Sequence, residues 1–134
     1  MNHPLFLDTN AIIQIFKGAN ESARQALASA THIVIPLVVY AEIKTGLDSQ
    51  PALRRKEQEL FEAFLATPGV EIHHPTEKTA NFYSRIFNQL KKQGTPIPTN
   101  DIWIAAETMD ADGTLFSDDH HFRSIPMLDL LPPG

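Results

Sequence analysis

The chain has 134 residues, of which 43% are hydrophobic and 20% are charged, and its formal net charge is −5. This composition excludes a disordered chain, and the length fits a single domain over residues 1–134. Because the sequence contains no cysteine, disulfide bonds and thiolate metal sites are excluded, so a bound metal would need oxygen or imidazole ligands.

The sequence lacks the marks of an exported or membrane-bound protein. Residues 1–4 carry no basic signal-peptide start, and Asp8 interrupts the first apolar run. No apolar stretch approaches the roughly 20 residues that span a bilayer. We therefore expect a cytoplasmic protein with no membrane partner.

The first half of the chain alternates strand patterns with helix patterns. Apolar and β-branched runs predict strands over 4–7 and 32–35. Helices are predicted over 11–18, 22–30 and 36–46. The last of these begins at Pro36 and should end at Gly46, because proline is tolerated in a first helical turn and glycine is favoured just past a helix end. Glu42 then lies inside this helix.

The second half continues the alternation. Amphipathic helices are predicted over 52–67, with Leu53 and Leu60 on the apolar face, and over 76–93, with Ala80 and Phe87 on that face. A further helix is predicted over 100–109, with Thr99 as its cap. Short strands are predicted over 70–73, 114–117 and 127–130.

Strands that alternate with helices favour an α/β fold with a central, mostly parallel sheet. Ligands bind to such sheets beyond the carboxyl ends of the strands. Asp8 and Asp119 both follow predicted strands, and Asp101 lies in the first turn of a predicted helix. These three carboxylates are therefore expected to face one crevice, which Glu42 would reach from the side of its helix.

Each of the four acids also has a simpler interpretation. Asp8 fits a helix cap and Asp101 fits the first turn of a helix, where the macrodipole favours an acid. Asp119 fits a solvated turn, and Asp118 beside it is its rival as the functional acid. Glu42 is harder to dismiss, because its helical neighbours three and four positions earlier are valines. Four such acids that converge would form a site for a divalent metal ion.

Four sequence segments, in the right order and over nearly the full length, resemble the PIN-domain ribonucleases, especially the VapC-type toxins of toxin–antitoxin pairs. The segments are Leu7-Asp8-Thr9-Asn10, Tyr40-Ala41-Glu42-Ile43, Asn100-Asp101-Ile102-Trp103-Ile104-Ala105-Ala106, and 115–122. In the last one the family pattern has a Ser or Thr two positions before the functional acid, which selects Asp119 over Asp118. The resemblance implies a three-layer α/β/α fold.

The resemblance also implies a magnesium- or manganese-dependent endoribonuclease that leaves a 5′-phosphate. On this interpretation the metal ligands are Asp8, Asp101 and Asp119, while Glu42 binds a water or a second ion and serves as a base. Side chains that would orient these carboxylates are Thr9, Asn10 and Ser117. The implied partners are an RNA substrate, a cognate antitoxin that blocks the groove, and a second copy in a homodimer.

Two other function classes stay open from the sequence: a catalytically idle module that binds antitoxin or RNA, and a metal-dependent phosphatase acting on small molecules. A zinc site built from the pairs His73-His74 and His120-His121 is disfavoured, because adjacent side chains on regular structure point apart. The negative net charge is unusual for an RNA-binding protein, but four of the acids are candidate ligands, and bound cations would attract phosphate.

Overall fold

The computed structural model describes residues 3–18 and 21–131. Within them lies a five-stranded sheet whose strands are all parallel, in the order β3-β2-β1-β4-β5. The strands are β1 (Leu5–Leu7), β2 (Ile33–Pro36), β3 (Val70–His73), β4 (Thr114–Phe116) and β5 (Leu130–Leu131). The first strand of the chain therefore occupies the centre of the sheet, between β2 and β4.

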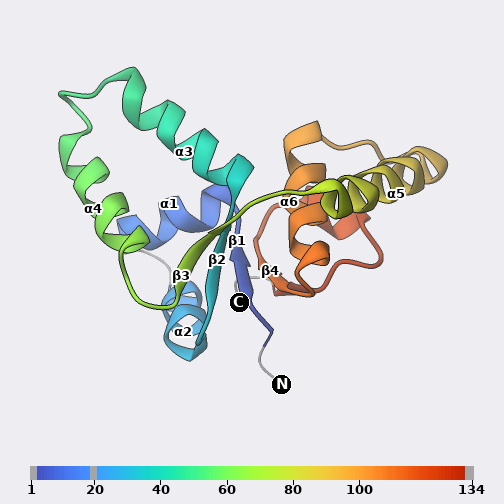
Figure 1. The fold of residues 1–134 in the computed structure, drawn as a ribbon, viewed down its shortest axis with the longest axis horizontal. Coiled ribbons are helices and arrows are strands. Elements are labelled where there is room, and N and C mark those ends of the chain that lie inside the picture. The colour runs from blue at the N-terminus through green and yellow to red at the C-terminus, as the bar shows by residue number, and fades with distance from the viewer. Residues whose placement is uncertain (1–2, 19–20, 132–134) are drawn as a thin grey trace.

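Helices cover both faces of the sheet, which gives the predicted three-layer α/β/α arrangement. They are α1 (Thr9–Lys17), α2 (Glu21–Ser29), α3 (Leu37–Ser49), α4 (Arg55–Leu65), α5 (Glu77–Gln93), α6 (Thr99–Asp110) and the 3-10 helix η1 (His120–Ser124). In Figure 1, α1, α3 and α4 lie on one side of the sheet, and α5 and α6 lie on the other. In the part of the chain that the structure describes, no helix is both long and apolar enough to cross a bilayer.

The core lies between the sheet and the helices. Phe6 and Leu7 of β1 are fully buried, as expected for the central strand of a sheet that is covered on both faces. Gly113, just before β4, is buried against Phe6, and a Cβ atom there would lie 2.7 Å from the Phe6 ring. A side chain at this position would collide with the core, so the turn before β4 requires a glycine.

Several predicted boundaries were wrong. The helix that was expected to end at Gly46 continues as α3 to Ser49, because a glycine inside a helix weakens it without ending it. Thr99 lies inside α6 rather than capping it, and Pro98 takes the N-cap position. The last strand is Leu130–Leu131 rather than 127–130, because only these two residues pair with β4.

Four apolar residues that were assigned to buried helix faces, Leu53, Leu60, Ala80 and Phe87, are exposed. Leu53, which is 74% exposed, lies in the turn before α4, so it does not belong to the buried face of that helix. Phe87 on α5 is 44% exposed, and Ala80 is also exposed. Thr79 is fully buried instead, and the backbone N–H of Thr76 donates to its hydroxyl at 2.9 Å. The buried face of α5 is therefore rotated from the predicted one.

Candidate metal centre

Two of the four candidate acids lie at the carboxyl ends of neighbouring parallel strands. Asp8 directly follows β1, and its side chain caps α1 by accepting from the backbone N–H of Ala11 at 2.8 Å. Asp119 follows β4 and caps η1 by accepting from the backbone N–H of His121 at 3.0 Å. Because β1 and β4 are paired in parallel, these two caps lie at the same edge of the sheet.

Ser117 connects these two acids. Its hydroxyl donates to Asp8 Oδ2 and accepts from the backbone N–H of Asp119 at 3.0 Å. Both Ser117 and Asp8 are buried, with exposed fractions of 2% and 4%. A single buried hydroxyl therefore joins the carboxylate of Asp8 to the backbone of Asp119, and the orienting role expected for Ser117 stays a prediction.

Asp101 joins the group from the first turn of α6. Its Oδ2 lies 2.9 Å from Nδ1 of His121, and the same nitrogen lies 3.3 Å from Oδ1 of Asp119. His121 thus bridges two of the candidate ligands. His121 was not predicted as part of the acid site, although its position two residues after Asp119 was the available signal.

Glu42 reaches the site from α3, on the other side of the sheet from α6. The hydroxyl of Thr9 donates to its Oε1 at 2.8 Å. Glu42 is exposed, although Val39 one turn earlier is fully buried. The apolar face that was expected to surround Glu42 therefore ends before it, and the carboxylate faces solvent at the edge of the site.

Asp118 has no hydrogen bond to the other acids, although its negative charge contributes to raising the pKa of Asp8. It is exposed, and Gln14 Nε2 donates to its Oδ2 at 3.2 Å. Asn10 is also exposed, and its side chain has no hydrogen-bond partner within the described residues. The structure thus brings together Asp8, Asp101, Asp119, Glu42, Thr9 and Ser117, and leaves Asn10 outside the hydrogen-bonded network.

The electrostatics of the site favour a bound cation. Burial raises the pKa of Asp8 from 3.8 to about 6, against the lowering effect of the Ser117 and Ala11 hydrogen bonds. Burial also raises the pKa of Asp101, which the His121 contact lowers and the charges of Asp119 and Glu42 raise. Carboxylates that destabilise one another in this way are stabilised by a positive ion between them.

The donor set is mainly oxygen, which suits magnesium or manganese. It also includes imidazole, because Asp119, His120 and His121 each offer a ligand atom and these atoms lie within 4.8 Å of one another. The two histidine rings lie 4.5 Å apart. The expectation that adjacent histidines point apart was therefore wrong for this pair, because the 3-10 helix η1 does not separate them as a strand would.

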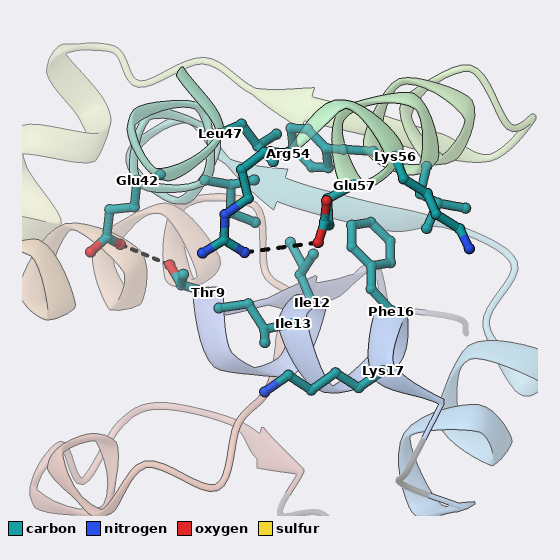
Figure 2. A pocket seen from close by; sticks show the side chains of 14 residues that line it. Thr9, Ile12, Ile13, Phe16, Lys17, Glu42, Leu47, Arg54, Lys56 and Glu57 are labelled. Atoms are coloured by element: carbon teal, nitrogen blue, oxygen red, sulfur yellow. Dashed lines mark hydrogen bonds and ion pairs between the residues drawn. The ribbon is translucent and has the colours of Figure 1, made fainter. Parts of the chain in front are cut away.

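A groove extends from Glu42 away from the sheet, between α1, α3 and α4, with a volume of about 500 Å³. Figure 2 shows Thr9 and Glu42 at one end, with the apolar side chains of Ile12, Ile13 and Phe16 along α1. Charged side chains border it, namely Lys17, Arg54, Lys56 and Glu57, and Arg54 Nη1 lies 3.8 Å from Glu57 Oε1. Leu60, which also lines the groove, is 45% exposed. The groove therefore combines an apolar floor with a rim of both basic and acidic side chains.

The sequence profile of the PIN domain family matches residues 5–127, a range that includes all four acids. The chain belongs to the PIN domain family. Among its relatives, Ribonuclease VapC1 of Haemophilus influenzae (strain R2866) is 32% identical over 115 residues, or 83% of each chain. The strain 86-028NP protein of the same name matches equally well.

Solved structures of similar fold include VapBC2 from Rickettsia felis, bound to a DNA fragment from its promoter. It has a TM-score of 0.83 at 25% identity, and the match covers 96% of this chain and 98% of that chain. VapBC-1 from nontypeable Haemophilus influenzae has a TM-score of 0.80 at 28% identity, covering 96% and 97% of the two chains. The predicted PIN-like fold is confirmed.

Proposed function

We propose that this protein is a metal-dependent endoribonuclease and the toxin of a toxin–antitoxin pair. The observation that carries the proposal is the convergence of Asp8, Asp101 and Asp119, which come from distant parts of the chain and are linked through Ser117 and His121. Membership of the PIN domain family and the relatives named Ribonuclease VapC1 support RNA as the substrate.

The proposed metal is magnesium or manganese, held by Asp8, Asp101 and Asp119 directly or through water. A divalent ion supplies two effects at such a site: it neutralises charge on phosphate oxygens and it favours the ionisation of water. The buried, mutually repelling carboxylates fit this role because their ionised forms are disfavoured without a cation.

Glu42 is assigned the role of base. The Thr9 hydroxyl fixes its Oε1, and its exposure at the end of the groove leaves the carboxylate accessible to water and substrate. In the proposed reaction Glu42 takes a proton from the attacking water, a P–O bond forms as the bond to the 3′-oxygen breaks, and that oxygen leaves with a proton from solvent. The products are a 5′-phosphate and a 3′-hydroxyl.

The proposed antitoxin occupies the groove between α1, α3 and α4. The VapBC structures that this chain resembles support an antitoxin partner. The groove offers an apolar floor that includes exposed Ile13 and Leu60, and it ends at Thr9 and Glu42. A segment seated there would cover apolar surface and at the same time block the access of RNA to the acids.

The proposal also assigns a homodimer, as the VapC resemblance implies, and a cytoplasmic location, where RNA substrates are found. Sedimentation of the purified protein at micromolar concentration tests the homodimer, and a monomer would contradict it. Fractionation of cells that express the protein tests the location, and recovery in the membrane fraction would contradict it.

The test of the function is cleavage of RNA oligonucleotides by purified protein with and without magnesium. We expect magnesium-dependent cleavage that Asp101→Asn reduces to background, while the matched variant Asp118→Asn, with the same charge change outside the network, stays active. Full activity of an Asp8→Asn, Asp101→Asn double variant would overturn the proposal.

The same assay separates the two alternatives. Hydrolysis of small phosphoesters without cleavage of RNA would favour a phosphatase. RNA or antitoxin binding without any hydrolysis, at any magnesium concentration, would favour the idle binding module. An active preparation that cleaves RNA and ignores small phosphoesters supports the endoribonuclease.

A further inference from the structure

Another carboxylate, which lies outside the acid site, is buried more deeply than any of the four candidate acids. Glu107 lies in the last turn of α6 and is 0% exposed. Burial raises its pKa, and hydrogen bonds from His73 and from the backbone of Leu37 lower it. A buried glutamate is disfavoured unless its contacts compensate for lost hydration, so the partners of Glu107 indicate what it does.

Glu107 binds the first residue of a helix on the other side of the sheet. Its Oε1 accepts from the backbone N–H of Leu37, the first residue of α3, at 3.0 Å. The same oxygen lies 2.8 Å from Nδ1 of His73, at the end of β3. Its Oε2 has no hydrogen-bond partner in the part of the chain that the structure describes. One oxygen therefore carries both contacts.

The start of α3 needs such a partner. Pro36 occupies the N-cap position, and its side chain makes no capping hydrogen bond. The first backbone N–H groups of a helix have no partner within the helix, and they carry a partial positive charge that favours a carboxylate. Glu107 supplies the missing cap from α6, a different element on the opposite layer.

His73 extends this contact to a third helix. Its Nε2 lies 3.3 Å from Oδ2 of Asp110, the last residue of α6. That oxygen accepts from the hydroxyl of Thr79 on α5 at 2.6 Å. Asp110, with a side chain 9% exposed, and Thr79 are both largely shielded from water. The buried polar contacts therefore hold α6 at two points and limit its rotation relative to the sheet.

The two helices joined by Glu107 carry two members of the acid site. Glu42 lies in the second turn of α3, and Asp101 lies in the first turn of α6, nearly two turns before Glu107. The charge of Glu42 acts on Asp101 across the site. A shift of α3 against α6 would change the separation of these carboxylates directly.

We propose that Glu107 is a positioning residue that caps α3 from α6 and thereby fixes the separation of Glu42 and Asp101 at the metal centre. This inference rests on the proposed function, since it assumes that the acids hold a metal. It predicts that loss of the Glu107 contacts weakens metal binding more than the accompanying loss of stability would.

The test uses the full chain and Mn²⁺ alone as the probe, with free Mn²⁺ measured by electron paramagnetic resonance. Glu107→Ala removes the cap, and we expect it to weaken Mn²⁺ binding by about tenfold or more, the scale seen when groups that orient metal ligands are removed. Glu107→Gln retains an oxygen that can accept from Leu37 and His73, so we expect it to bind Mn²⁺ within about threefold of the wild type.

A matched control separates positioning from stability. Ile33→Ala removes packing at the amino end of β2, the opposite end of the sheet from the acids, where Ile33 pairs with Val70. Chemical denaturation gives the stability of each variant. Ile33→Ala should lose stability but bind Mn²⁺ as the wild type does. Equal weakening of Mn²⁺ binding in this control would overturn the proposal.

Each remaining outcome is also decisive. If Glu107→Ala does not fold, Glu107→Asp keeps the charge but draws the carboxylate back by one methylene, and wild-type Mn²⁺ affinity in Glu107→Asp would overturn the inference. Wild-type affinity in folded Glu107→Ala would do the same. A wild-type protein that neither binds Mn²⁺ nor cleaves RNA would instead contradict the proposed function itself.

Discussion

Replacing Asp8 with asparagine should stabilise the metal-free protein at neutral pH while it removes metal-dependent cleavage. The pKa of Asp8 rises from 3.8 to about 6 on burial in the folded protein. At about 1.4 kcal/mol per pKa unit, ionised Asp8 destabilises the fold by about 3 kcal/mol relative to its protonated form. Asparagine carries no charge, so the variant avoids the destabilisation that comes from burying an ionised carboxylate.

The net gain is smaller than that figure, because asparagine has a single acceptor oxygen. Asp8 accepts from both Ser117 and the backbone N–H of Ala11, so the variant loses one of these hydrogen bonds. Such a loss costs about 1 kcal/mol, which leaves a net stabilisation of about 2 kcal/mol well above the folded pKa.

The sign of the pH dependence follows from the direction of the shift. The folded protein binds the Asp8 proton more tightly than the unfolded chain does, so protonation favours folding. This contribution is complete below 3.8 and is lost as the pH rises through about 6. The advantage of Asp8→Asn should therefore be full near about pH 8 and should shrink as the pH falls towards about 4.

The assay is urea denaturation followed by circular dichroism, with a chelator present, at several pH values. Asp118→Asn is the matched control, because it removes the same charge from an exposed position, and its stability should change far less. Adding magnesium should then stabilise the wild type and leave Asp8→Asn unchanged. A variant that is less stable than the wild type at every pH would refute this reasoning.

Three further substitutions test other contacts. Ser117→Ala should destabilise the protein by about 1–3 kcal/mol in urea denaturation, because it removes a buried hydroxyl bonded at both ends, and unchanged stability would contradict this. Thr9→Val frees the Glu42 carboxylate and should lower kcat with little change in KM; a change confined to KM would refute the assigned role. Leu60→Asp puts a charge in the apolar groove, so the free enzyme should stay active. Antitoxin binding, measured by calorimetry, should weaken by about tenfold or more. Unaltered affinity would exclude the groove as the antitoxin-binding site.

The sequence predicted the parts of the site that depend on local pattern. Asp8 and Asp119 follow apolar strands, and Asp101 opens a helix, so the rule that parallel strands end at one edge placed them together. The simpler interpretation of Asp8 was that it caps the helix that follows it, and Asp8 does cap α1. Capping and proximity to the other acids are compatible, because the cap uses Oδ1 of Asp8, while Oδ2 accepts from Ser117, which in turn contacts Asp119.

The contacts that join distant elements were not predictable from one sequence. His121 reaches Asp101 only because η1 packs against α6 in the fold. Glu107 reads as one more polar residue in a helical pattern, and its partners Leu37 and His73 lie far away in the chain. The exposure of Glu42 depends in the same way on how α3 is oriented over the sheet.

Boundaries failed where a local preference was outweighed by packing. Gly46 is favoured past a helix end, yet α3 continues through it because the helix is anchored on either side, by Val39 and by Leu47, which are both buried. Leu53 was read as a core residue because its spacing fits the helix that follows, but the helix begins after it. The spacing of apolar residues cannot show where a helix starts when the preceding turn carries an apolar residue at the same spacing.

The link between Ser117 and Asp8 spans 109 positions along the chain. The central strand β1 is therefore synthesised well before its neighbour β4, and the two can pair only after the residues between them have been made. A growing chain on the ribosome holds Asp8 but none of the partners from β4 and η1 that complete the proposed metal centre. For an enzyme that cuts RNA, this order of assembly delays the hazard: the ribosome and the message that it reads meet an active nuclease only after the last of the four acids has been made.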